Sequence, residues 1–384
     1  MKYFLISLVS ILSLSFLSCS TDEGTSIPAS VIGDQDEDST TETINDSYRY
    51  QLPIIFHVLY NNAKDTNQYV SYKRIKEILK NVNGLWKGGY YDYSEYGLTQ
   101  DMGVDFVLAD VDEEGNTLSQ PGVEYIKYSG SYPIDPETFM SDKSMKKYMW
   151  EPCEYINVML YNFKTTASDT TIMLGISHLP YTLTGDTQLA GLTTTSRYPL
   201  SKSNLTFCYC SSINSSFQSR GYEGNRYSYY TNNNKNVYFK ATDISSTIAH
   251  ELGHYLGLFH VFAEDGDSKA INSSDDTDYC DDTESYNYFE YQTFLKKKTA
   301  MSDFTMEEGT WRYDGVRNKT YNATNMMDYW VCFCNRFTTN QRERVRNILY
   351  YSPLIPGPKK LDSSGTAITR AADDYILPQT RAIK

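Results

Sequence analysis

The sequence predicts an α+β fold in which one mixed, twisted sheet packs against a histidine-bearing helix, followed by a smaller, loop-rich C-terminal subdomain. Strand-like and helix-like segments alternate from residue 50 onward, as an enclosed layered domain requires. Three of the five histidines lie within residues 250–260, inside a helical pattern. The chain of 384 residues is long enough to bury a full core.

Charge excludes one class of partner. The 48 acidic residues outnumber the 35 basic ones, which gives a net charge of −13. Nucleic acid is therefore not an expected partner, because phosphate binding needs clustered Lys and Arg. We expect a monomer.

The N-terminus is typical of an exported lipoprotein. Lys2 precedes the apolar run 4–18, which is short for a membrane span and is followed directly by Cys19. We interpret residues 1–18 as a signal peptide and Cys19 as the lipidated residue; an ordinary signal peptide with an incidental cysteine is the alternative. The stretch 20-STDE-23 resembles acidic export signals of Bacteroidetes-type bacteria. The expected location is the outer membrane, facing the exterior, with a periplasm-facing orientation as the alternative.

The remaining chain divides into a tether, a domain and a tail. Residues 19–48 are rich in Ser, Thr, Asp and Glu, which predicts a flexible lipidated tether. The predicted domain spans 49–353, and 354–384 form a loosely attached C-terminal tail.

The elements of the domain follow in order. Residues 50–60 are β-branched and aromatic, which predicts a strand, and 71–86 place Ile75, Ile78, Leu79 and Val82 on one helical face. Further strands are predicted at 103–111, 154–163 and 188–197. Two polar stretches, about 201–240 and 284–320, interrupt the alternation of strand-like and helix-like segments and are interpreted as surface insertions.

The helix predicted within 243–259 carries the chemistry. His250 and His254 are four residues apart in 250-HELGHYLGLFH-260, so both imidazoles project toward one point. Glu251 lies beside that point without binding an ion there. No straight helix brings His260 to the same place, but a left-handed Gly257 ends the helix and turns the chain. The pattern predicts zinc held by three histidines with a fourth position open for water, as in catalytic sites.

The other histidines receive a different interpretation. His57 and His178 each occur alone in a strand-like or loop context, so we expect a core or surface role for both.

The full motif HExxHxxGxxH resembles that of the metzincin metallopeptidases, which carry a methionine turn further along the chain. Here 325-NMMDYW-330 follows His260 in the right order. The resemblance implies that Met327 forms an apolar floor under the imidazoles without binding zinc. It also implies that Tyr329 offers its phenol to the metal or the reaction intermediate.

Within the metzincins the chain resembles the pappalysin family over most of residues 50–350. The matching motifs are 53-PIIFHVLY-60, 105-DFVLADVDEEGN-116, 150-WEPCEYINVML-160, Asp282-Thr283 and 337-FTTNQRERV-345. Glu284 departs from the proline usual after Asp-Thr, and the two insertions are atypical, which puts the shape of the substrate cleft in doubt. The chain is also similar to predicted zinc metallopeptidase lipoproteins of Bacteroidetes-type bacteria.

These residues predict a zinc-dependent endopeptidase. Zinc on His250, His254 and His260 would activate a water, with Glu251 as general base and Tyr329 stabilising the intermediate. The alternative from another class is a catalytically silent surface lipoprotein that uses the same fold for adhesion or binding. The expected partners are a protein or peptide substrate and the lipid anchor, and the sequence does not identify the substrate.

Two weaker patterns complete the sequence. Residues 264–282 include Asp265, Asp267, Asp275, Asp276 and Asp278, a candidate calcium loop whose alternative is a solvated acidic loop, because EF-hand spacing is absent. Beyond Cys19 there are six cysteines, for which export makes disulfides the expectation. Resemblance favours a bond from Cys280 to Cys332 or Cys334. No cysteine other than Cys19 precedes the domain, so we expect no cysteine-based latency switch, although an aspartate from the tether could serve.

Overall fold

The computed structural model describes residues 49–88, 99–165, 173–219, 229–230, 236–237, 243–265, 269–301, 304–329, 331–357 and 381–383. The predicted signal peptide, Cys19, the tether and Asp267 lie outside the described residues. Among the residues that are described, no helix combines the length and apolarity that crossing a membrane requires.

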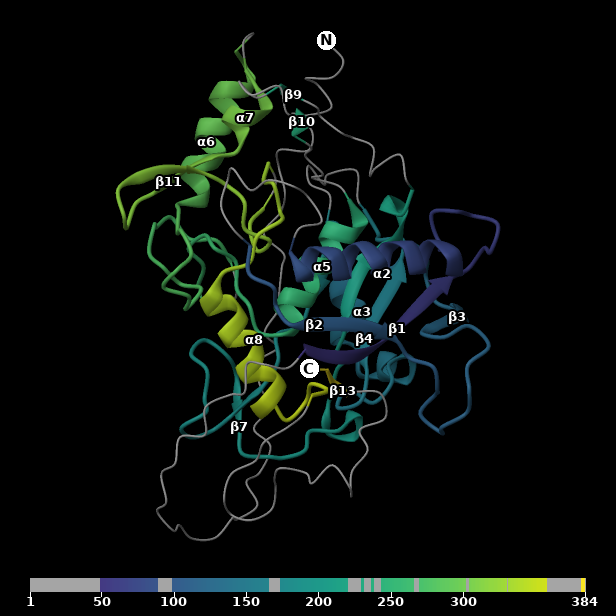
Figure 1. Ribbon diagram of the computed structural model, residues 1–384. Coiled ribbons are helices and arrows are strands. Elements are labelled where there is room, and N and C mark those ends of the chain that lie inside the picture. Colours follow the sequence, from purple (N-terminus) through teal and green to yellow (C-terminus); the bar gives the residue numbers. More distant parts are fainter. Residues whose placement is uncertain are drawn as a thin grey trace.

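One twisted, mixed sheet organises the molecule (Figure 1). The long strand β1 (Arg49–Tyr60) pairs in parallel with β2 (Val104–Leu108) and β3 (Val123–Lys127) on one side and with β4 (Ile156–Tyr161) on the other. Next to β4 lies parallel β8 (Ser211–Asn214), and antiparallel β5 (Gly175–Ser177) follows it at the edge of the sheet order. The α+β fold expected from the sequence is confirmed.

Two helices pack against this sheet and against each other (Figure 1). Helix α2 (Tyr72–Lys87) begins at Ser71, whose side chain accepts from the Arg74 amide, and it buries its apolar face against β2 and α5. Trp86 Nε1 of α2 donates to the Ala249 carbonyl of α5 (Ile244–Tyr255) at 3.2 Å. The contact fixes α5 over the β8 and β5 end of the sheet.

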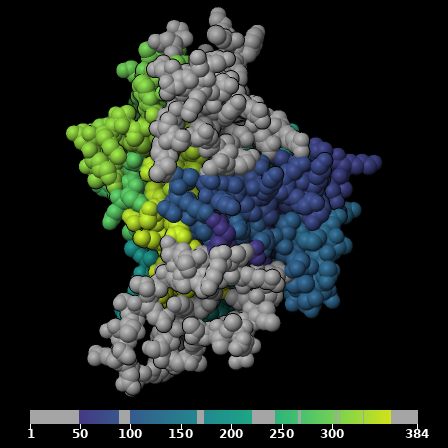
Figure 2. Space-filling view, in the orientation of Figure 1, coloured from purple at the N-terminus to yellow at the C-terminus, as the bar shows by residue number. Residues whose placement is uncertain are grey.

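The C-terminal part of the chain, green to yellow in Figure 2, lies along one flank of the purple and blue N-terminal elements. It includes helix α8 (Thr339–Tyr351), which begins with a reciprocal cap between Thr338 and Gln341. The other described elements are short: α3 (Pro136–Ser141), η2 (Lys143–Tyr148), β6 (Thr182–Leu183), β7 (Thr194–Thr195), η3 (Lys202–Asn204), η4 (Ser215–Phe217), β9 (Tyr229–Tyr230), β10 (Asn236–Val237), α6 (Tyr288–Thr299), α7 (Met306–Gly309), β11 (Trp311–Asp314), β12 (Lys319–Asn322) and β13 (Arg381–Ile383).

The prediction for residues 188–240 was wrong in one important respect. The segment 188–197 contributes only the two-residue strand β7, while the parallel strand β8 lies inside the stretch expected to be a surface insertion. Its Ser211 and Ser212 carry no apolar signal, but both are buried and bonded: Ser211 Oγ to Ser177 Oγ at 2.7 Å, and Ser212 Oγ to Tyr161 Oη at 2.9 Å. Hydroxyl groups whose hydrogen bonds are satisfied can be buried in a core, although the spacing of apolar residues predicts only apolar residues there.

The second expected insertion also contributes to the core. Residues 284–320 form α6, α7 and most of the β11–β12 hairpin, which lie together at one end of the molecule (Figure 1). They bury Tyr286, Tyr291 and Arg312, so only part of this stretch is surface. The expected tail differs as well, because Leu354 and Ile355 are fully buried and β13 pairs antiparallel with the start of β1.

Candidate metal centre

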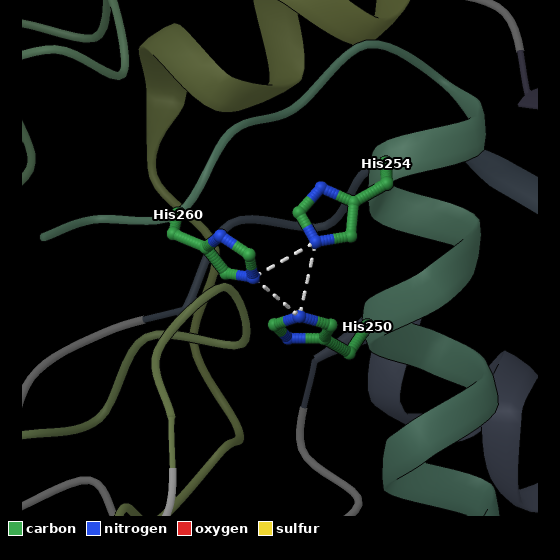
Figure 3. Close-up of side chains that lie close together, drawn as sticks. All are labelled: His250, His254 and His260. Atoms are coloured by element: carbon green, nitrogen blue, oxygen red, sulfur yellow. Dashed lines mark hydrogen bonds between the residues drawn. The ribbon is translucent and has the colours of Figure 1, made fainter. Parts of the chain in front are cut away.

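The end of α5 places the third histidine near the first two. Gly257 has a φ of +93°, and its amide donates to the His254 carbonyl at 2.8 Å while the Leu258 amide donates to the Gly253 carbonyl at 2.9 Å. This pair of bonds is the Schellman ending of a helix, in which a left-handed residue turns the chain out of the helix axis. The chain then returns His260 toward the face that carries His250 and His254 (Figure 3).

The three Nε2 atoms form a nearly equilateral triangle (Figure 3). The separations are 3.1 Å between His254 and His250, 3.1 Å between His254 and His260, and 3.2 Å between His250 and His260. Tetrahedral zinc at about 2.0–2.1 Å from each nitrogen would separate them by roughly 3.3 Å. Among the described residues this is the one group of three or more potential ligands that converges on a point.

The other ring nitrogens show which tautomer each imidazole adopts. Nδ1 of His250 lies 2.8 Å from the Met326 carbonyl, and Nδ1 of His254 lies 2.8 Å from the Leu258 carbonyl. Nδ1 of His260 lies 2.5 Å from Glu264 Oε1. Each partner is an acceptor, so each Nδ1 carries the hydrogen and each Nε2 turns a lone pair toward the centre of the triangle.

Burial keeps these imidazoles neutral. Removal from water lowers the pKa of His250 and of His260 to about 3 each, and it lowers the pKa of His254 well below its usual value. Three uncharged nitrogens whose lone pairs face one another at this spacing are the donor set that zinc prefers. The residues present therefore fit a zinc ion.

Glu251 lies beside the triangle but is not one of its corners. Burial raises the pKa of its carboxyl to about 8, and within the described residues Oε2 has no hydrogen-bond partner. Gly175 at the start of β5 packs directly against the Glu251 side chain, since a Cβ at position 175 would lie 2.7 Å from Glu251 Cγ. The carboxylate lies between α5 and the edge strand β5, and its Oε2 can accept a proton.

The methionine turn lies beneath the histidines. Met327 is fully buried, and a Cβ on Gly253 of α5 would lie 2.4 Å from its sulfur, so the glycine of the motif leaves room for the thioether. Asn325 holds the turn through its Oδ1, which accepts from the Met327 amide at 2.9 Å. The ring of Tyr329 lies 4.3 Å from that of His260 and is partly exposed.

Sequence reasoning missed the role of Glu264. Its side chain is 4% exposed, burial raises its pKa well above the usual range, and it holds the hydrogen of His260 Nδ1. In the sequence it is only the first acidic residue of the stretch 264–282. The spacing of four from His260 carries no signal here because this stretch is not helical.

The remaining predicted residues lie away from this centre. His57 is buried between Glu124 and Asn157, and His178 stacks on Tyr209 at 5.5 Å. Within the described part of the acidic loop, Asp265, Asp275, Asp276 and Asp278 do not form a converging group of three ligands. Calcium binding stays a prediction. None of the six described cysteines forms a disulfide, so the expected bond from Cys280 to Cys332 or Cys334 is not formed.

A peptidase family model described as pregnancy-associated plasma protein-A matches residues 211–350, which run from β8 through the histidine motif and the methionine turn to α8. The chain is similar to the pappalysin metallopeptidases. The matched range is shorter than the resemblance expected over residues 50–350. Because it includes the whole motif, it supports a metallopeptidase in broad terms.

One solved structure supports the fold, and a second is similar to part of the chain. A Tannerella forsythia promirolysin mutant is 18% identical, with a TM-score of 0.50 over 78% of this chain and 80% of that one. Mature mirolysin of the same organism, in complex with a cleaved peptide, is 19% identical, with a TM-score of 0.49 over 77% of this chain and 90% of that one. No curated protein sequence matches the chain.

Proposed function

We propose that this chain is a zinc-dependent endopeptidase. The observation that carries the proposal is the triangle of Nε2 atoms, each with its lone pair directed inward and its Nδ1 hydrogen bonded elsewhere. A histidine cluster with a purely structural role has no need to aim three lone pairs at one point, because such an arrangement is repulsive without a cation.

Residues of the chain then supply the proton transfer. When bound, zinc acts as a Lewis acid and lowers the pKa of water in its open coordination position. Glu251 Oε2, free of protein partners in the described structure, accepts the proton of the attacking water and passes it to the leaving peptide nitrogen. The Tyr329 hydroxyl donates to the oxygen of the substrate carbonyl as negative charge develops there.

Replacement of the general base tests this assignment. In the full mature chain, Glu251→Gln should retain zinc while cleavage of a mixed peptide library falls by about 10²–10⁴-fold. His254→Ala should lose zinc and activity together. Metal analysis of the purified variants and a chelator control on the wild type separate the two effects. Full cleavage by Glu251→Gln would contradict the mechanism, and absence of cleavage by the wild type would support the silent-lipoprotein alternative.

We also propose that the mature chain is anchored by lipid on Cys19 to the outer membrane and faces the exterior. The support is the apolar run 4–18 directly before Cys19 and the acidic stretch behind it. Acyl chains on one residue contribute about 0.8 kcal/mol per buried CH₂, so two or more hold a soluble domain firmly. Cys19→Ser should move the protein from the membrane fraction to the soluble fraction. Unchanged sedimentation with membranes would contradict lipidation, and resistance to protease added to intact cells would contradict the outward orientation.

A further inference from the structure

The β11–β12 hairpin reverses the usual pattern of an amphipathic strand. Trp311 and Tyr313 face outward and are 38% and 52% exposed, whereas the charged Arg312 and Asp314 between them face inward and are buried. A buried arginine needs specific partners, because an unpaired charge in the core is strongly unfavourable. Two partners of Arg312, Asp328 and Tyr329, belong to the methionine turn.

Arg312 binds the backbone on the C-terminal side of that turn. Its Nη2 donates to the Tyr329 carbonyl at 3.1 Å and to the Val331 carbonyl at 3.3 Å, while Nη1 donates to the Gly309 carbonyl at 3.1 Å. The guanidinium lies over the ring of Tyr291 of α6, 3.5 Å from its centroid. The side chain therefore joins the methionine turn to the α6–α7–hairpin unit, residues 288–322.

Asp328 completes the arrangement at the peptide group that precedes Tyr329. Its Oδ2 lies 3.5 Å from Arg312 Nε, and its Oδ1 accepts from the Tyr329 amide at 2.6 Å and from the Tyr286 hydroxyl at 2.5 Å. The amide and the carbonyl of Tyr329 are thus both held by one buried ion pair. With both flanking peptide groups held, the Cα–Cβ bond of Tyr329 has a set direction.

That direction brings the Tyr329 ring to the metal centre. Its centroid lies 4.3 Å from the ring of His260 and 5.8 Å from that of His250. We propose that Arg312, paired with Asp328, is a positioning residue that holds Tyr329 where its hydroxyl reaches the reacting carbonyl. This inference rests on the role of Tyr329 in the proposed function, and it gives the buried pair of Arg312 and Asp328 a part in positioning the tyrosine.

The contacts require arginine. A planar guanidinium presents several N–H groups in fixed directions and stacks on an aromatic face, whereas an ammonium is a compact point charge. Lysine at position 312 would retain the charge beside Asp328 without spanning the two carbonyls and the Tyr291 ring. Arg312→Lys is therefore the informative change, and Arg317→Lys is the matched control. Arg317 lies on the same hairpin, pairs with Asp314 at 3.0 Å and is half-exposed.

The experiment compares kcat, KM and bound zinc for the full mature chain. Arg312→Lys should lower kcat by about tenfold or more, as a small misplacement of a reacting group does, with KM and zinc per chain little changed. Arg317→Lys should match the wild type. Loss of zinc in Arg312→Lys, or unchanged kcat, would overturn the proposal.

A double-mutant cycle separates positioning from general packing. In a Tyr329→Phe background Arg312→Lys should cause no further loss of kcat, because the hydroxyl that it positions is absent; losses that multiply would overturn the proposal. If Arg312→Lys does not fold, Tyr286→Phe, which removes only the hydroxyl on Asp328, should show a smaller loss with the same dependence on Tyr329. If the wild type is active and Tyr329→Phe retains full activity, the inference is also overturned. If the wild type is inactive, the proposed function itself is overturned.

Discussion

The three histidines differ in what holds their Nδ1 hydrogens. Main-chain carbonyls accept from His250 and His254, while the carboxylate of Glu264 accepts from His260. A carboxylate behind a ligating imidazole fixes its orientation and makes its other nitrogen a better donor to a metal. Within the described residues the second oxygen of Glu264 has no hydrogen-bond partner, so burying this side chain is unfavourable to the metal-free fold.

Glu264→Gln should therefore weaken zinc binding by about 10–100-fold. The metal-free variant should be at least as stable as the metal-free wild type, because a neutral amide costs less to bury than a partly unpaired carboxylate. Chelator competition measures the affinity, and thermal unfolding of the metal-free proteins measures the stability. Glu284→Gln is a control, since Glu284 pairs with Lys319 and Arg336 instead of a histidine. A destabilised metal-free variant with unchanged zinc affinity would show that Glu264 is only structural.

Gly257 determines whether the chain that leaves α5 can bring His260 to the two histidines of the helix. Its φ of +93° lies where a side chain is strained, and a Cβ there would lie 2.8 Å from Ile348 Cγ1 of α8. Gly257→Ala should cost about 1–2 kcal/mol in backbone strain alone, with the steric contact in addition. We expect His260 to shift and zinc affinity to fall by more than tenfold, measured by chelator competition.

A second substitution, at Ile348, separates the steric contact from the backbone strain. Ile348→Val removes Cδ1, which would lie 3.3 Å from the added Cβ, and keeps the nearer Cγ1, so it should restore only a small part of the stability lost in Gly257→Ala, while the backbone strain persists. Complete rescue would show that packing against α8, and not the left-handed conformation, is what position 257 requires. Arg344 of α8 adds to this packing, because its Nε donates to the Gly257 carbonyl at 2.6 Å.

Elements with a strong periodic signal could be predicted, and those held by polar contacts could not. The long apolar strand β1, the amphipathic α2 and the capped α5 follow directly from the spacing of their apolar residues. Strand β8 was missed because its buried serines are satisfied by partners distant in the chain. The hairpin of β11 and β12 had one local signal, Asp314-Gly315 between two strand-like runs, but nothing local shows that its charged residues face inward.

The residues of the site divide in the same way into those that could be predicted from the sequence and those that could not. The five fixed positions of the histidine motif predicted which side chains would meet, because helix geometry and one glycine determine their positions. Glu264 and Arg312 act through contacts across loops, at separations that sequence spacing does not encode. Calcium binding by the acidic loop stays a prediction: Asp278 accepts from the Cys280 amide and the Thr283 hydroxyl, and the described carboxylates of the loop do not form a converging group of three.

Across the whole molecule, the metal centre joins parts of the fold that are otherwise held by separate contacts. His250 and His254 belong to α5, His260 follows the bend, and the Nδ1 partners of the three lie on the methionine turn, the bend and the acidic loop. A zinc ion bound only by the folded chain stabilises it by RT ln(1 + [Zn]/Kd), about 2.7 kcal/mol when zinc is at 100 times Kd.

Chelation should therefore lower Tm. At about 2–4 °C per kcal/mol for a large domain, the expected fall is roughly 5–10 °C, and it should be reversed by added zinc. Differential scanning fluorimetry of the mature chain with and without chelator measures this change. Glu251→Gln should show the full shift, since it keeps all three ligands, whereas His254→Ala should show little. An equal Tm with and without chelator in the wild type would mean that the three histidines do not bind metal with useful affinity, and the proposed chemistry would then lack its central ion.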